Sequence, residues 1–280
     1  MFRCLALFAA LLLLTPWAAA QTRDERPATL FNWHGAPSEP LGELEPIATD
    51  RPDFTETSST VGLGVVQIES GYTFAQDDDL VSHSWGEPLL RVGVLANWLE
   101  FRTAVFPTSQ IIESGPIRQT DSGTEDLYLG FKLALTPQNG LLPEVAITPQ
   151  MTVPTGSSAF TAGQVLPGVN VLYGWDLNDR LTTGGSTQFN SALDGTDSRY
   201  TEWAQSMTLG YSITENLGSY VEWYALFPHG AADVNPMQYF NGGLTYRLTD
   251  DVQFDVRAGM GLNDSADDFF AGSGFSVRLK

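Results

Sequence analysis

Apolar and polar residues alternate along most of the chain from residue 66 onward. The clearest case is the segment 125–136, EDLYLGFKLALT, in which every second residue from Leu127 to Leu135 is apolar. Asp126 and Lys132 fall on the other parity, together with two small residues and a tyrosine. Because successive side chains of a β-strand point to opposite faces of a sheet, this segment predicts a strand with one wholly apolar face and one face that carries charges.

The same alternation recurs in about twelve segments of the chain. They are centred on residues 66–74, 87–94, 99–105, 125–136, 144–153, 169–173, 180–190, 202–213, 221–227, 241–248, 254–260 and 275–279. Short turns alternate with longer polar loops, which we place at 76–83, 108–123, 155–163, 191–199, 228–236 and 263–268. The pattern predicts an all-β fold, an up-and-down antiparallel transmembrane β-barrel of about 12 strands with short periplasmic turns and longer outer loops.

A secreted β-sandwich or lectin-like domain would show the same parity, with the apolar face turned toward a core. Two features favour the barrel. Sandwich strands average about five or six residues, whereas strands of about ten residues tilted near 45° match the thickness of a membrane. The two ends of a sandwich also carry similar loops, whereas short turns and longer loops alternate along this chain. The apolar parity contains no Asp, Glu, Lys or Arg, and Gln205 and Gln238 are its most polar members. We therefore expect the apolar face to contact lipid and the polar face to line a wet lumen.

The N-terminus has the features of a secretory signal peptide. Arg3 precedes an apolar stretch from Leu5 to Leu14, and the small residues at 18–20 predict cleavage before Gln21. The predicted organisation is a signal peptide at 1–20, a flexible lead at 21–48, a periplasmic plug segment at 49–60 and a barrel at 61–280. Export and a barrel together predict the outer membrane of a double-membrane bacterium, with outer-membrane lipid as a partner.

The composition of the chain excludes several kinds of partner and structure. Removing Arg3 from the 14 basic residues leaves 13 Lys and Arg against 33 Asp and Glu, a balance that argues against nucleic acid as a partner. Cys4 leaves with the signal peptide, so no disulfide or thiol chemistry is expected. No window of 18 apolar residues follows, so no membrane-spanning helix is expected either.

Candidate catalytic and metal-binding residues are few. The three histidines are His34, His83 and His229, and none has the spacing of a nucleophile–base arrangement. The acidic runs 77–79 and 267–268 lack the repeated ligand spacing of a Ca²⁺ loop, and solvated loops are the favoured interpretation. The sequence predicts a protein that is not an enzyme and has no cofactor or metal site.

Charged residues on the polar parity are nearly balanced, with eight acidic and six basic members. Such charges are expected to pair across neighbouring strands rather than to form a ring of one sign. The predicted lumen and transport-path residues are Glu69, Glu87, Arg91, Glu100, Arg102, Asp126, Lys132, Glu144, Glu202, Glu222, Arg247, Asp255, Arg257 and Arg278. Two interpretations stay open: a salt-bridged lumen with a narrow path for a small solute, or a closed barrel whose charges only satisfy one another.

The octapeptide TDRPDFTE at 49–56 differs from the lead before it, because it combines one arginine with three acids, an aromatic residue and a proline that stiffens the backbone. We expect it to fold into the periplasmic mouth as a small plug. The predicted pairs join Arg51 to Glu100 or Glu144, and Asp53 or Glu56 to Arg102 or Arg257. The predicted plug residues are Asp50, Arg51, Pro52, Asp53, Phe54 and Glu56. The alternative is an ordinary solvated leader.

Several stretches resemble the putative MetA-pathway of phenol degradation family, outer-membrane-like proteins usually called transporters. They are TDRPDFTE (49–56), EPLLRVGV (87–94), EDLYLGFKLALT (125–136), ITPQMTVPTGS (147–157), YGWDLNDRL (173–181) and DDFFAGSGFSVRL (267–279). The resemblance implies export or uptake of small solutes, aromatic or hydrophobic ones among them, and fixes no substrate. We therefore predict an outer-membrane channel, with a non-conducting structural or ligand-binding barrel as the alternative. The solute, the direction of transport and the oligomeric state stay open.

Overall fold

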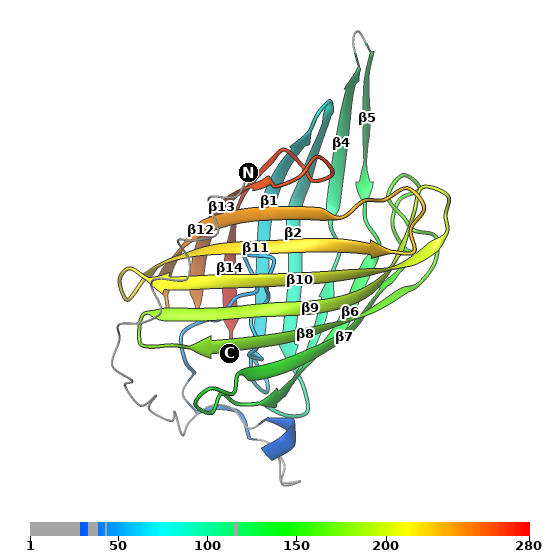
Figure 1. The fold of residues 1–280 in the computed structure, drawn as a ribbon. Coiled ribbons are helices and arrows are strands. Elements are labelled where there is room, and N and C mark those ends of the chain that lie inside the picture. The colour runs from blue at the N-terminus through cyan, green and yellow to red at the C-terminus, as the bar shows by residue number, and fades with distance from the viewer. Residues whose placement is uncertain (1–28, 33–38, 43, 115–116) are drawn as a thin grey trace.

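The computed structural model describes residues 29–32, 39–42, 44–114 and 117–280, so the predicted signal peptide and part of the predicted lead lie outside the described residues. The described chain consists of antiparallel strands and a short 3-10 helix, η1 (Leu30–Asn32) (Figure 1). The strands are β1 (Val66–Asp77), β2 (Leu80–Gly93), β3 (Leu99–Ala104), β4 (Pro107–Ser114), β5 (Ile117–Thr124), β6 (Leu127–Thr136), β7 (Glu144–Val153), β8 (Leu166–Asp176), β9 (Leu181–Leu193), β10 (Arg199–Ser212), β11 (Leu217–His229), β12 (Met237–Thr249), β13 (Val252–Gly261) and β14 (Phe269–Leu279).

Twelve of these strands close into a barrel, as the sequence predicts. β1 pairs with β2 on one side and with β14 on the other, and the ring continues in chain order apart from β4 and β5. Val66 lies opposite both Val92 of β2 and Leu279 of β14, so the first and last strands complete the ring. Closure pairs the backbone of every strand in the ring, which a sheet surrounded by lipid requires.

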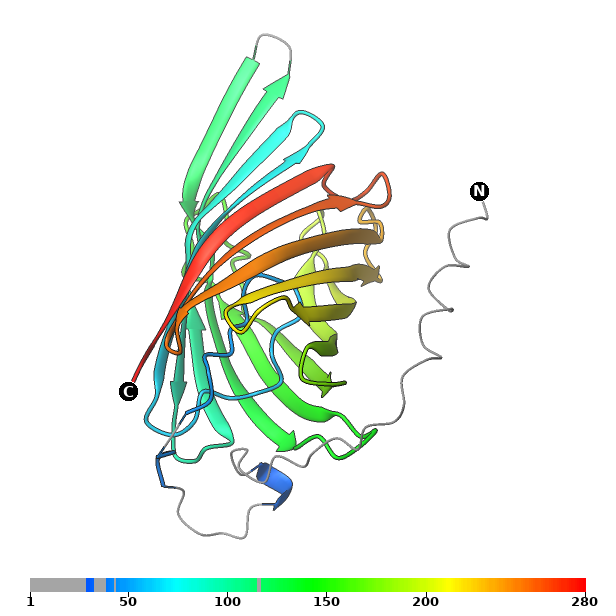
Figure 2. The ribbon, with the colours of Figure 1, turned by 90° about the vertical axis from the view of Figure 1, so that its left-hand side faces the viewer.

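The strands β4 and β5 form a hairpin that projects beyond the rim of the barrel (Figure 2). β4 pairs with the outer half of β2, where Ser84 lies opposite Thr108. The predicted loop at 108–123 is therefore wrong, and so is the predicted loop at 76–83, which belongs to the tall β1–β2 hairpin. Both segments lie beyond the membrane-facing wall, where no apolar outer face is needed. The hydrophobic alternation that marks the other strands is therefore absent there.

The distribution of buried residues is the reverse of that in a water-soluble domain. Arg91, Glu100 and Lys132 point into the barrel and are completely buried, whereas Phe131 and Met207 are 45% and 66% exposed on its outer surface. An apolar outer face around a polar interior has no counterpart in a β-sandwich with a dry core, so that alternative is excluded. The lipid-facing and lumen-facing parities of residues 127–135 are as predicted.

Connections at the two ends of the barrel differ in length, as expected. Tight turns join β8 to β9, β10 to β11 and β12 to β13, whereas longer segments precede β8, β12 and β14 at the opposite end (Figure 1). In the described part of the chain, helices that could cross a membrane are absent.

Candidate functional site

Residues 49–60, which we call the lumen segment, run through the interior of the barrel (Figure 2). The segment contacts opposite walls. Asp50 reaches cations on β2, β3 and β6, whereas Thr55 donates a backbone hydrogen bond to Glu222 of β11 at 2.7 Å. The Thr55 hydroxyl also lies 2.6 Å from the Ser206 hydroxyl of β10. The segment therefore spans the lumen from wall to wall.

Asp50 lies among three buried cations. Its Oδ2 accepts a hydrogen bond from Arg102 Nη2 at 2.6 Å and lies 3.4 Å from Arg91 Nη1. Its Oδ1 accepts a hydrogen bond from Lys132 Nζ at 2.9 Å. Burial alone would raise the pKa of Asp50, but the three cations outweigh it and hold this pKa below its ordinary value. Asp50 is therefore charged and fixes the segment to this wall.

Two wall carboxylates complete this network. Arg91 donates to Glu100 Oε1 at 2.8 Å and to Glu69 Oε1 at 3.0 Å. Arg91 and Arg102 lie directly opposite each other on β2 and β3, an arrangement that repels unless acids separate the charges. Glu56 provides another such acid, since it accepts a hydrogen bond from Arg102 at 2.5 Å. The Glu56–Arg102 pair is one of those named from the sequence.

The partners of Arg51 differ from those expected. Its guanidinium pairs with Glu87 and lies 3.4 Å from Asp255, whereas Glu100 is bound by Arg91 and Glu144 accepts a hydrogen bond from the Ser58 hydroxyl at 2.9 Å. Pairing of Arg51 with Glu100 or Glu144 is therefore a wrong prediction. The physical reason is the course of the segment, which turns Arg51 toward β1, β2 and β14 instead of β3 and β7.

A pair of glycines makes room for the Arg51 guanidinium. Gly71 of β1 lies opposite Gly274 of β14. A Cβ at either position would come within 2.3 or 2.4 Å of the guanidinium atoms. At Gly71 only the close approach of Arg51 requires glycine, whereas at Gly274 a Cβ would also come within 2.6 Å of the Ser70 backbone oxygen of the neighbouring strand. The sequence analysis missed the space formed by these two glycines, although glycines inside predicted strands were the signal available.

The opposite wall holds the segment mainly through backbone atoms. Glu222 accepts hydrogen bonds from the amides of Phe54 and Thr55 at 2.8 and 2.7 Å and from the side chain of Asn241 at 2.7 Å. Arg257 donates to the Pro52 carbonyl at 2.7 Å. This wall therefore recognises the backbone of the segment, in contrast to the ion pairs at the other wall.

A row of aromatic rings leads from the lumen segment along the wall. Phe54 lies flat on Tyr224 of β11, with ring centroids 4.4 Å apart and planes 3° from parallel. Tyr224 stacks on Tyr239 of β12 at 4.7 Å, and Tyr239 meets Phe270 of β14 edge-on at 6.1 Å. The sequence analysis missed this row, because three separate strands and the lumen segment supply its members.

The remaining residues predicted for the lumen lie outside these contacts. Asp126 accepts backbone hydrogen bonds from Gly156 and Ala162, both at 2.9 Å, and so ties down an outer loop. Glu202 shares a hydrogen bond with Tyr200 near the outer end of β10. Two arginines lie at the short-turn end. Arg247 donates to the Glu215 carbonyl at 2.5 Å, and Arg278 pairs with Asp251 at 2.6 Å. The structure therefore brings together only part of the predicted set.

Asp53 makes the lumen segment sensitive to pH. Burial and the nearby Glu222 carboxylate hold the pKa of Asp53 well above its ordinary value. A raised acid pKa means that the folded state binds the proton more tightly. The contribution of Asp53 to stability is therefore greatest below the unfolded pKa of about 4 and is lost as pH rises through the folded value.

We expect Asp53→Asn to raise the thermal unfolding midpoint at neutral pH and to flatten its pH dependence, because the amide needs no proton to remain neutral. The measurement is a series of melting curves of the folded barrel from pH 4 to pH 8. Asp233→Asn in an exposed outer loop is the control. A difference in melting point between Asp53→Asn and the wild-type protein that does not grow as pH rises would contradict the expectation.

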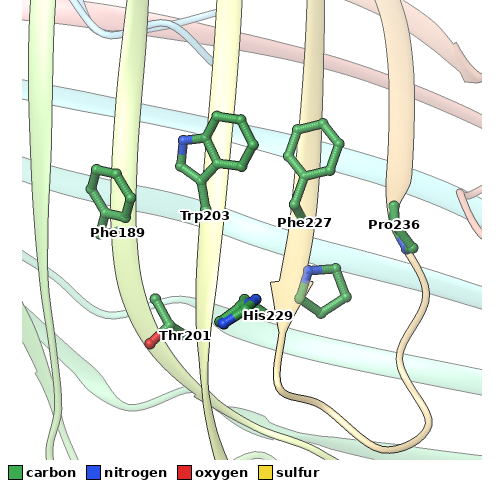
Figure 3. Close-up of a pocket in the computed structure, with 7 residues that line it drawn as sticks. Phe189, Thr201, Trp203, Phe227, His229 and Pro236 are labelled. Carbon is green, nitrogen blue, oxygen red and sulfur yellow. The ribbon is translucent and has the colours of Figure 1, made fainter.

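The two acidic runs approach each other at the outer rim, where the Asp78 amide donates to Asp268 at 3.2 Å. Among the described residues, however, no three His, Cys, Asp or Glu side chains are placed to hold a metal ion. A separate hollow of about 390 Å³ lies on the outer surface (Figure 3). Trp203 and Phe227 stack beside it at 4.7 Å, and His229 lies at its edge. This hollow faces away from the lumen.

Comparison with known proteins identifies the fold and the family. The model of the family described as "Putative MetA-pathway of phenol degradation" matches residues 49–279. An outer membrane channel from Pseudomonas putida superposes with a TM-score of 0.65 at 13% identity, covering 81% of this chain and 100% of that one. The NanC porin superposes with a TM-score of 0.53 at 12% identity, covering 76% and 100%. A search of curated proteins found no match. The fold is that of the outer-membrane β-barrels.

Proposed function

Because this chain belongs to the putative MetA-pathway of phenol degradation family, we propose that it is an outer-membrane channel for small aromatic or hydrophobic solutes, with residues 49–60 as its plug. The family description points to phenolic compounds. The Pseudomonas putida protein that shares the fold is an outer membrane channel. We propose no catalytic role for the protein.

One observation carries the proposal: the lumen segment is bound to the barrel by ion pairs and hydrogen bonds. Lys132 and Asp50 meet at 2.9 Å, and the Glu222 carboxylate holds two backbone amides. When a segment held by such polar contacts moves, water that enters the lumen can hydrogen-bond to the groups that it leaves, which a tightly packed apolar core does not allow. A segment held in this way supports a detachable plug and therefore a transport path along the lumen-facing residues.

The aromatic row supports the choice of solute. Tyr224 and Tyr239 present stacked rings inside an otherwise polar lumen, and Arg257 lies 5.6 Å from the Phe270 ring. Stacked aromatic side chains offer a flat apolar surface on which the ring of an aromatic solute can stack. A lumen that only had to satisfy its own charges would have no use for this row.

The plug proposal predicts an increase in conductance when the segment is removed. Deletion of residues 49–60 should raise single-channel conductance in planar bilayers severalfold and lower the unfolding temperature, because both walls lose their partners. Deletion of 21–28, which leaves the lumen segment intact, is the control. Unchanged conductance and stability would refute the plug. A deletion variant that folds and conducts nothing would favour a non-conducting barrel instead.

A further inference from the structure

Phe54 occupies a position at which the inner surface of the barrel wall recognises a flat ring. Its ring covers Tyr224 face-to-face, and Tyr239 backs Tyr224 on the far side. Tyr224 and Tyr239 are directly paired across β11 and β12. The wall therefore supplies a rigid two-ring platform, and the third ring of the stack comes from the lumen segment. Any planar ring of similar size could replace it.

Polar atoms without partners lie next to this platform. Glu222 and Asn241 are the next inward-facing pair along the same two strands, roughly 7 Å from Tyr224 and Tyr239. Asn241 is 2% exposed, and its Oδ1 has no hydrogen-bond partner among the described residues. Tyr220 is the inward-facing residue of β11 beyond Glu222 and is 9% exposed. Its hydroxyl also has no hydrogen-bond partner among the described residues. Buried polar atoms are ordinarily hydrogen-bonded, so these two mark a place for a polar group of a ligand.

The spacing between the Tyr224 ring and Asn241 indicates which chemical groups the ligand carries. A ring stacked on Tyr224 that carries one hydroxyl group directed along the strand reaches the row of Asn241, where the Oδ1 atom can accept the hydrogen bond. A ring without the hydroxyl leaves Asn241 unsatisfied, and a saturated ring loses the face-to-face contact with Tyr224. A single-ring aromatic alcohol meets both requirements at once.

We propose that Phe54 stands in for a single-ring aromatic alcohol, and that such a solute binds by displacing the Phe54 ring from Tyr224 while donating its hydroxyl proton to a hydrogen bond with Asn241 Oδ1. Displacement removes the ring contact of the lumen segment with the β11–β12 wall. Solute binding is therefore coupled to a weaker attachment of the segment at this wall, where the hydrogen bonds to Glu222 and Arg257 remain. The inference rests on the proposed channel function, because it assigns the solute class and the binding position within the same lumen.

The coupling has a measurable consequence. Removing the Phe54 ring removes the competitor, so a variant without it should bind the solute more tightly. A stacking contact of this kind corresponds to a change in apparent affinity of roughly three- to tenfold. Removing Tyr224 instead destroys the platform, so the response to solute should be lost.

The test uses the full-length barrel in planar bilayers with phenol as the probe, and toluene and cyclohexanol as matched solutes that lack the hydroxyl group or the aromatic ring. We expect phenol to raise wild-type conductance with saturation, and the other two to act only at clearly higher concentration. In Phe54→Ala, and in Phe54→Leu should the first variant fold poorly, basal conductance should be higher and half-saturation should occur at lower phenol. Tyr224→Leu should abolish the response, whereas Tyr211→Leu on the outer surface should retain it.

The outcomes separate this inference from the channel proposal. If the protein conducts but its conductance does not change with phenol, or changes equally with cyclohexanol, the proposed binding position is wrong and the channel function is unaffected. A phenol response that persists in Tyr224→Leu also overturns it. An absence of conductance in wild type, Phe54→Ala and the 49–60 deletion alike would overturn the channel function itself.

Discussion

Arg91→Met is expected to lower the free energy of unfolding by about 3–5 kcal/mol, the effect of removing one partner from a buried ion pair. Arg91 has no exposed surface and pairs with both Glu69 and Glu100, which are also completely buried. Methionine fills much of the volume of the arginine side chain but removes the cation shared by both carboxylates, so that Glu100 keeps only the longer pair with Arg102 at 3.7 Å. The measurement is equilibrium urea unfolding of the barrel in lipid vesicles.

Three comparisons identify the cause of this loss. Arg180→Met at an exposed turn position should change stability by less than about 0.5 kcal/mol. The double variant Arg91→Met/Glu100→Gln should recover part of the lost free energy of unfolding, because it also removes the negative charge of Glu100. The deficit should also shrink at acidic pH as carboxylates become neutral. A loss below about 1 kcal/mol would mean that the lumen charges are screened by water like surface pairs.

Val256→Arg is expected to destabilise the barrel by about 2–4 kcal/mol, the cost of a cation at the middle of the lipid face. Val256 is 51% exposed on the outer surface, in the middle of β13, and neighbours Arg257, which points into the lumen. The same unfolding measurement applies.

Depth in the membrane provides the control for this substitution. Leu248→Arg, on an equally exposed outward residue beside the β12–β13 turn, should cost only about 0–1 kcal/mol because an arginine there reaches the interface. Equal losses at the two positions would contradict the membrane orientation. A soluble, detergent-independent monomer would contradict the barrel in a membrane altogether.

The sequence by itself determined the wall of the barrel. The twelve wall strands, their lipid and lumen faces, and the short turns at one end could all be predicted, because the membrane imposes a period of two on every spanning strand. Leu127 to Leu135 show why: each position needs only its own parity to be assigned, and no distant residue enters the argument.

Only the tertiary structure decided what fills the lumen. Whether Arg51 meets Glu87 or Glu144 depends on the stagger of distant strands and on the course of the segment, neither of which leaves a local pattern. The β4–β5 hairpin escaped prediction because its two strands lack the alternation of apolar and polar residues that marks the wall strands. The stack of Phe54 on Tyr224 joins residues 170 positions apart in the sequence, and its geometry exists only once the ring of strands has closed. Local periodicity sets which way a side chain points, and closure sets which side chain it meets.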